Sequence, residues 1–341
     1  MVSVQNPQQF LKDFTQQAEK AERRIYLQSM LFEYGKVLSE LEPILIKKAK
    51  EGLEVQIHID WVSQRYSEGN PNIILPLYGE KRRRMLHVHH QSKLLRDRLT
   101  DAGVIITFTN PPGLITKVLS IFGRNHKKLY IVDDDVWVGG INLFDMAFDN
   151  IDVMVKFTES EFLEILSKEF YKINENKHQE NYCVSFNKDS ELLVDAGLVG
   201  KSLIYDEAIM LIQQATKSIT FVSQFVPEVK LLNALIEASD RDVDITVITS
   251  PMLHEYFVEF PYKITYQLFL AKTKNKNNIK IFYQDRQVHA KLFIADHQTA
   301  IFGSHNFVST GGILGTEELA IKTTDQHLVQ QLEEFIKTET N

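Results

Sequence analysis

The feature that most constrains the fold of this chain is a short motif that occurs twice. The first copy, NHKKLYIVDDDVWVGGIN, spans 125–142, and the second, VHAKLFIADHQTAIFGSHN, spans 288–306. Each copy contains a histidine, a lysine two positions later and an aspartate five positions after the lysine, and then a glycine-containing turn and an asparagine. The distance from histidine to asparagine is 16 positions in the first copy and 17 in the second. Two copies with nearly equal spacing indicate a duplicated unit.

The segments around the two motifs repeat as well. Each half shows a strand pattern, a helix pattern and a second strand pattern, at 21–32, 37–52 and 53–60 and again at 215–226, 230–240 and 243–250. Strands that alternate with helices indicate an α/β fold. We therefore predict two lobes related by a pseudo-twofold axis, each a mostly parallel central sheet flanked by helices. The first lobe would span 1–185 and the second 186–341.

The spacing inside the motif predicts which side chains meet. Residues i and i+2 of a strand share a face, so His126 and Lys128 point together while Leu129 and Ile131 pack on the opposite side. The second copy repeats this arrangement. Each half thus offers an imidazole, an ammonium and a carboxamide, which suit an anionic phosphate centre. One histidine could attack phosphorus while the other protonates the departing oxygen. The residues expected to bind the phosphate are Lys128, Lys291, Asn142 and Asn306.

The aspartates of the motif differ from its histidines and lysines in strand parity. The whole motif gives the candidate catalytic residues His126, Lys128, Asp133, His289, Lys291 and Asp296. Asp133 and Asp296, however, have the wrong strand parity to face the phosphate. A structural, turn-fixing or ion-pairing role is therefore expected for these two.

The duplicated His-x-Lys-x4-Asp motif resembles the hallmark of the phospholipase D superfamily, and the resemblance covers nearly the whole chain. The segments GRNHKK (123–128), GGIN (139–142), AGVIITFTNP (102–111) and FVSQFVPEVKLLNAL (221–235) are most like the bacterial cardiolipin synthase branch. The resemblance implies two phospholipase D-like lobes, a phosphohistidine intermediate, a ping-pong transfer to an alcohol or water, and no metal or other cofactor.

The resemblance also implies roles for individual residues. His126 would be the nucleophile, and His289 the general acid that later acts as base, although this order could be reversed. An acid shortly after each motif would orient a histidine. Asp152 and Glu318 fit that role best, with Glu317 as a rival for the second position.

Composition and charge limit the kinds of partner and compartment that we expect for this chain. The chain has 38 Lys and Arg against 45 Asp and Glu, a formal charge of -7, which disfavours a dedicated nucleic-acid binder. One cysteine, Cys183, cannot form an internal disulfide. Residues 1–24 lack the apolar core of a signal peptide, and the chain has no apolar run of membrane-spanning length. We expect a cytoplasmic monomer that could work peripherally at a membrane surface.

The expected function is phosphodiester transfer on phospholipids. The substrate would be a phosphatidylglycerol-like lipid and the acceptor an alcohol or water, giving cardiolipin synthase-like phosphatidyl transfer, phospholipase D hydrolysis or both. The main alternative is a phospholipase D-family nuclease that acts on DNA or RNA. A third alternative is a binding module on an inactive scaffold.

Four further segments have both a structural and a functional interpretation. The histidines of HVHH (87–90) are expected to be structural or surface residues rather than metal ligands. KRRR (81–84) would either attract anionic headgroups or form a solvated face. GLITKVLSIFG (113–123) would be a membrane-dipping lid or a buried helix. The aromatic segment 256–270 is expected to belong to the core.

Overall fold

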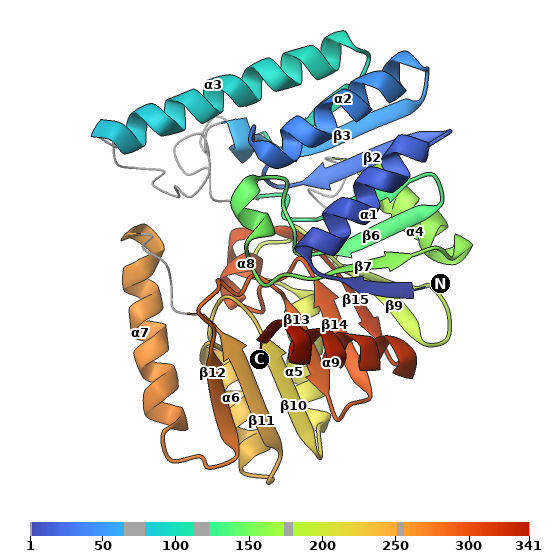
Figure 1. Ribbon diagram of the computed structural model, residues 1–341. Coiled ribbons are helices and arrows are strands. Elements are labelled where there is room, and N and C mark those ends of the chain that lie inside the picture. The colour runs from blue at the N-terminus through green and yellow to red at the C-terminus, as the bar shows by residue number, and fades with distance from the viewer. Residues whose placement is uncertain (1, 65–78, 112–122, 174–179, 251–255, 341) are drawn as a thin grey trace.

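The computed structural model describes residues 2–64, 79–111, 123–173, 180–250 and 256–340, which form two β-sheets with flanking helices (Figure 1). The first sheet has seven strands in the order β1-β7-β6-β5-β2-β3-β4, and the second has eight in the order β12-β11-β10-β13-β14-β15-β9-β8. The two motif copies occupy corresponding central strands, β5 and β13. The two-lobed α/β architecture predicted from the sequence is therefore confirmed.

The first lobe contains most of the amino-terminal half of the chain. Its strands are β1 (Val2–Gln5), β2 (Arg24–Ser29), β3 (Glu54–Asp60), β4 (Ile105–Thr109), β5 (Leu129–Val132), β6 (Asp135–Gly139) and β7 (Met154–Phe157). Its helices are α1 (Pro7–Lys20), α2 (Lys36–Lys50), α3 (Gly79–Asp101) and α4 (Ser160–Tyr171), with short 3-10 turns at Trp61–Gln64 and Asp145–Phe148.

The second lobe repeats this order. Its strands are β8 (Tyr182–Ser185), β9 (Ser190–Ala196), β10 (Ser218–Val222), β11 (Asp244–Thr249), β12 (Ile279–Tyr283), β13 (Leu292–Ala295), β14 (Thr299–Gly303) and β15 (Glu317–Thr323). Its helices are α5 (Leu203–Gln214), α6 (Val229–Ser239), α7 (Tyr256–Thr273), α8 (Ser309–Leu314) and α9 (Gln326–Thr340). Strand β8 pairs with β9 in this sheet, and the division of the chain into units at 185 and 186 stays a prediction.

The prediction of mostly parallel sheets is wrong, because both sheets are mixed. Among the strands that the structure describes, parallel pairs join β2, β3 and β4 in one lobe and β10, β11 and β12 in the other. The remaining pairs are antiparallel. Helical crossovers keep successive strands parallel, whereas the tight turns inside the motifs force hairpins between β5 and β6 and between β13 and β14.

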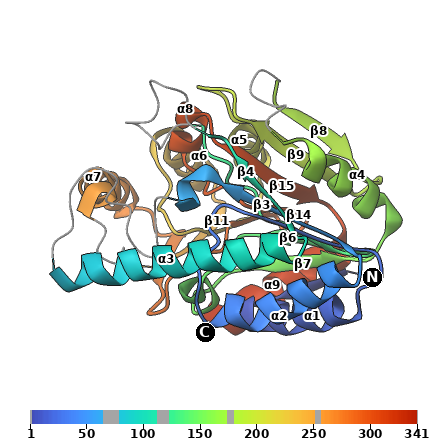
Figure 2. The same cartoon turned by 90° about the horizontal axis from the view of Figure 1, so that it is seen from above.

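Three buried hydrophobic clusters form the core, one within each lobe and one between the lobes. Helices α1, α2 and α3 cover one face of the first sheet, and α5, α6 and α7 cover one face of the second. The third cluster joins the lobes, because Leu129 and Ile131 of β5 pack with Leu292 and Ile294 of β13. These residues are the motif positions predicted to pack away from the histidines. Figure 2 shows the helices layered outside the sheets.

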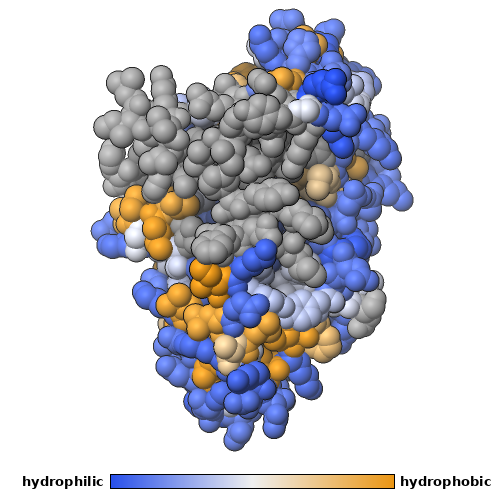
Figure 3. All heavy atoms as spheres, turned by 90° about the vertical axis from the view of Figure 1, so that its left-hand side faces the viewer, coloured by the Kyte–Doolittle hydropathy of each residue, from blue (hydrophilic) through white to orange (hydrophobic). Residues whose placement is uncertain are grey.

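Helix α7 is only partly a core element. Phe269 is fully buried, but Ile264 and Leu268 are 58% and 42% exposed. The prediction that 256–270 belongs to the core therefore holds for one side of the helix only. Figure 3 views the face that carries α7, where apolar side chains gather on the lower lobe.

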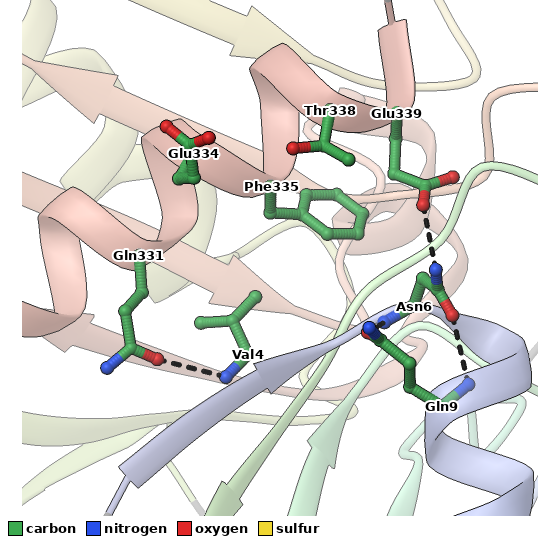
Figure 4. A pocket seen from close by; sticks show the side chains of 8 residues that line it. All are labelled: Val4, Asn6, Gln9, Gln331, Glu334, Phe335, Thr338 and Glu339. Atoms are coloured by element: carbon green, nitrogen blue, oxygen red, sulfur yellow. Dashed lines mark hydrogen bonds between the residues drawn. The ribbon is translucent and has the colours of Figure 1, made fainter.

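The two ends of the chain meet. The Val4 backbone N–H donates to Gln331 of α9 at 3.2 Å, and the Asn6 amide donates to Glu339 at 2.8 Å. A shallow pocket lies beside these contacts (Figure 4). Because β1 pairs with β7 while α9 packs on β14, these contacts fasten the first lobe to the second.

Candidate active site

The two motif histidines stand where the lobes exchange backbone hydrogen bonds. His126 lies just before β5, and its N–H donates to the carbonyl of Glu317 in the other lobe at 2.8 Å. His289 lies just before β13, and its N–H donates to the carbonyl of Ile151 at 2.8 Å. Each motif therefore begins on a segment that is bound to the opposite lobe, and both histidines lie at the lobe interface.

Each histidine is also held by an acid from the opposite lobe. The Nδ1 atom of His126 lies 2.9 Å from both carboxylate oxygens of Glu318, and the Nδ1 atom of His289 lies 2.6 Å from Oδ2 of Asp152. A carboxylate at Nδ1 fixes the proton there and directs Nε2 away from it. The histidine side chains are 13% and 14% exposed, so both rings can still be reached.

The two lysines are completely buried beside the histidines. Lys128 Nζ donates to the carbonyl of His126 at 2.6 Å, and Lys291 Nζ donates to the carbonyl of His289. An ammonium has three donors, so each lysine retains hydrogens for a further acceptor. Burial lowers the pKa of Lys128 well below its ordinary value, against the effect of Glu318. Burial lowers the pKa of Lys291 to about 8, against Asp152 and Glu318.

Burial and neighbouring charges shift the pKa values of the two histidines. Burial lowers the pKa of His126 well below its ordinary value, and the charges of Lys128, Lys291 and His289 lower it further. Burial and Lys291 lower the pKa of His289 to about 4, although Asp152 acts in the opposite direction. Four basic groups thus share one small region, where burial and their mutual repulsion favour the neutral forms of the histidines. An anionic phosphate among them would favour their protonated forms.

The two asparagines differ in their surroundings. The Oδ1 atom of Asn142 accepts from Ser29 Oγ at 3.2 Å and from the Leu31 N–H at 3.4 Å, which turns the amide nitrogen away from these donors. The buried Oδ1 atom of Asn306 has no hydrogen-bond partner among the described residues. The role of the two asparagines in binding phosphate stays a prediction.

The motif aspartates do not join this group. The carboxylate of Asp133 accepts backbone N–H groups of residues 22–24, and that of Asp296 accepts those of residues 216–218. Both aspartates sit in the turn at the far end of the motif strand from its histidine. A catalytic role for these two aspartates therefore stays an untested prediction. Their contacts match the turn-fixing role that strand parity predicts.

Glu317 faces away from the histidines. Its carboxylate accepts from the Asn110 amide at 2.8 Å and lies 3.4 Å from Lys127 Nζ. Lys127 is itself bound to Glu169 at 2.8 Å. Because neighbours on a strand point to opposite faces, only Glu318 of this pair can reach His126.

Two residues of the motif turn, Gly140 and Ser304, have a role at the site that the sequence did not predict. A Cβ atom on Gly140 would lie 2.2 Å from Oδ1 of Asp152, so the glycine makes room for that carboxylate. Ser304, at the equivalent place in the second copy, donates through Oγ to Glu318. Both belong to the glycine-containing turn of the motif, and their contacts with the acids depend on strands that are distant in the sequence.

The other segments lie elsewhere. HVHH and KRRR are part of α3, where Arg83, Arg84, His87 and His90 are exposed. Among the described residues, no group of three histidine, cysteine or acidic side chains could hold a metal ion. Of the predicted lid, only residue 123 lies within the described residues.

Comparison with known proteins agrees with this geometry. Residues 208–339 match the family model described as "Cardiolipin synthase, PLD-like domain". The chain is 22% identical over 330 residues to cardiolipin synthase B of Salmonella typhi, covering 89% of this chain and 71% of that protein. It is 24% identical to the cardiolipin synthase of Alkalihalophilus pseudofirmus, covering 85% of this chain and 56% of that protein.

Solved structures show the same fold. The phosphatidylserine synthase of Haemophilus influenzae superimposes with a TM-score of 0.75 at 13% identity, covering all of this chain and 86% of that chain. Residues 208–339 thus match a phospholipase D-like domain of the cardiolipin synthase kind. The matches over most of the chain indicate an enzyme that is similar to the cardiolipin synthases. No helix among the described residues is long and apolar enough to span a bilayer.

Proposed function

We propose that this enzyme transfers a phosphatidyl group from a phospholipid to an alcohol, in the manner of a cardiolipin synthase, and that water can replace the alcohol to give phospholipase D hydrolysis. The observation that carries the proposal is the crossed pairing of His126 with Glu318 and of His289 with Asp152. It gives two oriented imidazoles in one cationic region, which is what displacement at a phosphodiester requires.

In the first step, Nε2 of His126 attacks phosphorus. The nitrogen–phosphorus bond forms, the bond from phosphorus to the leaving alcohol breaks, and His289 gives its proton to that alcohol oxygen. Lys128 and Lys291 neutralise the charge on the remaining phosphate oxygens, and Asn142 and Asn306 bind the same oxygens.

In the second step, the acceptor enters. His289, now neutral, removes the proton from an alcohol or water, and the acceptor oxygen attacks phosphorus. The nitrogen–phosphorus bond to His126 breaks, and the enzyme returns to its starting state. The same residue acts as acid and then base because the second step is the first in reverse with a different alcohol.

The two acids support this division of roles. Burial works against ionisation of Asp152, but the charge and hydrogen bond of His289 outweigh it and lower the pKa of that carboxyl. Burial raises the pKa of Glu318. A firmly ionised partner stabilises an imidazolium, so His289 is the better proton carrier and His126 the better nucleophile.

The test is product analysis with defined lipids. Purified enzyme is incubated with phosphatidylglycerol, with and without added glycerol, and the products are identified by mass spectrometry. We expect cardiolipin or phosphatidic acid from the wild type and neither from His126→Ala or His289→Ala. Wild-type levels of product from either variant would contradict the mechanism.

The nuclease alternative is tested with the same protein. A nuclease that depends on phosphate contacts should lose activity steeply as ionic strength rises. Salt-sensitive cleavage of DNA or RNA, with no lipid product, would favour that alternative.

A further inference from the structure

We propose that α7 and the amino-terminal end of α3 form a docking face for a lipid bilayer that carries anionic headgroups. The proposal rests on the proposed function and deepens it, because it names the surface through which the enzyme reaches a lipid substrate. Neither element contains any residue of the catalytic site.

Helix α7 presents an apolar stripe to solvent. Ile264 and Leu268 are 58% and 42% exposed and lie one helical turn apart, and the exposed Ala271 continues the same side. The opposite side is core, since Phe269 and Thr273 are buried. An exposed stripe on a helix whose other face is already packed has no role in holding the lobe together.

Lysines flank this stripe on both sides. At about 3.6 residues per turn, Lys263 and Lys272 fall on opposite flanks of the stripe, and Lys274 follows directly after the helix end at Thr273; all three are exposed. Lys272 donates to the neutral amide of Asn233 at 2.7 Å and so keeps its charge uncompensated by that contact. Lys276, just past the helix, pairs with Asp240.

The charge of this segment is opposite to that of the whole chain. The stretch 263–280 holds five lysines and no acidic residue, whereas the protein carries a net charge of -7. A basic, partly apolar segment that includes the carboxyl-terminal part of α7 and the residues after it favours one orientation of an acidic protein toward a negatively charged surface.

The first lobe contributes a matching element. Arg83 and Arg84 of α3 are exposed, and Leu86 beside them is 50% exposed. Figures 1 and 2 both show the amino-terminal end of α3 on the same side of the molecule as α7, which is the side viewed in Figure 3. Each lobe thus offers basic and apolar side chains to a single face.

A bilayer suits this combination better than a nucleic acid does. Phosphate groups of either partner could pair with the lysines and arginines. Only a bilayer also gives Ile264, Leu268 and Leu86 an apolar place to enter, at the boundary between headgroups and acyl chains. Each lysine near an anionic membrane strengthens partitioning by about fivefold.

The test is vesicle flotation with the full chain. Vesicles of phosphatidylcholine alone are compared with vesicles that contain phosphatidylglycerol as well. We expect the wild type to float with the anionic vesicles only, and less at high salt. Lys272→Gln with Lys274→Gln should weaken partitioning by about 25-fold, at about fivefold for each lysine. Ile264→Asn with Leu268→Asn should also weaken it.

Controls separate this face from general charge effects. Lys168→Gln with Lys188→Gln removes two lysines whose side chains are 68% and 89% exposed outside α3 and α7, and should bind vesicles like the wild type. The proposal is overturned if the wild type does not bind anionic vesicles, or if the α7 variants bind them as well as the wild type does. It is also overturned if single-stranded DNA displaces the vesicles from the same lysines in direct competition.

Failure of the docking face and failure of the proposed function give different results. Turnover is measured on a short-chain phosphatidylglycerol dissolved as monomers, which needs no docking. The α7 variants should keep wild-type turnover on this substrate while losing vesicle binding. If the wild type binds vesicles but shows no turnover, the docking face is supported and the proposed function is contradicted.

Discussion

Glu318 lies in the second half of the chain but holds His126 of the first, with both carboxylate oxygens 2.9 Å from Nδ1. The reciprocal pair is His289 with Asp152, at 2.6 Å. Neither half therefore contains a complete histidine–acid pair. The chemistry depends on how the lobes are joined, and a lobe expressed alone would lack it.

Neighbouring glutamates allow a matched test of this pairing. Glu318→Gln keeps the shape but removes the negative charge beside His126, and we expect kcat to fall by about 100-fold to 10000-fold. Glu317→Gln disturbs the buried pair with Lys127 instead, so it should lower the free energy of unfolding and affect kcat far less. Steady-state kinetics and urea unfolding distinguish the two. Equal kcat losses in both variants would argue against a specific role for Glu318.

Gly140 gives a second prediction. Its Cβ position lies 2.2 Å from Oδ1 of Asp152, so Gly140→Ala should push that carboxylate away from His289 and lower kcat by about 10-fold to 100-fold. The control is a double-mutant cycle with Asp152→Ala, which vacates the space. If the glycine acts through Asp152, the second substitution should add little to the first. Fully additive losses would show an independent effect.

Asp195 lies directly opposite Glu318 on the adjacent strand, and both carboxyls are buried. Burial raises the pKa of Asp195 to about 7, against hydrogen bonds from Ser202 and Leu203. The folded state thus binds a proton that the unfolded state releases above its ordinary pKa of 3.8. This contribution to stability is present at low pH and is lost as pH rises toward 7.

Asp195→Asn should therefore become more stable relative to the wild type as pH rises. Each unit of pKa shift corresponds to about 1.4 kcal/mol, so the difference between variant and wild type should change by up to about 4 kcal/mol from pH 4 to pH 8. Urea unfolding across this range measures it. A difference that is independent of pH would show that Asp195 titrates normally.

Asp296 supplies a prediction on stability alone. Its carboxylate accepts three backbone N–H groups before β10 and the Thr216 hydroxyl at 3.0 Å. Asp296→Ala should lower the free energy of unfolding by about 2 kcal/mol, because those donors lose their acceptor. Turnover by the folded protein should change by less than about threefold. A kcat loss of about 100-fold without loss of stability would indicate that Asp296 takes part in catalysis.

Much of this arrangement could be predicted from the sequence because the motif has strand periodicity. Alternation predicted that Leu129 and Ile131 are buried while His126 and Lys128 face elsewhere, and the structure has Leu129 and Ile131 in the core that joins the lobes. The order of strand, helix and strand in each half also predicted α2, β3, α6 and β11 to within a few residues.

Other features depend on contacts that no local pattern reveals. The turns at Asp133 and Asp296 reverse the chain as the motif predicts, but the sequence does not show that the resulting hairpins lie in the same sheets as the parallel strands. The crossed acids follow from backbone pairing between lobes. Gly140 and Ser304 support those acids through distances that appear only when distant strands meet.

The central claim is that two histidines from opposite lobes act on one phosphorus atom, and trapping the covalent intermediate tests it most directly. The enzyme is mixed with a phosphatidylglycerol substrate, quenched, digested under alkaline conditions that preserve phosphohistidine, and analysed by mass spectrometry. We predict a phosphatidyl adduct on the peptide that contains His126, and none in His126→Ala. An adduct on any residue other than the two histidines, or turnover by the wild type without an adduct on either, would contradict the account.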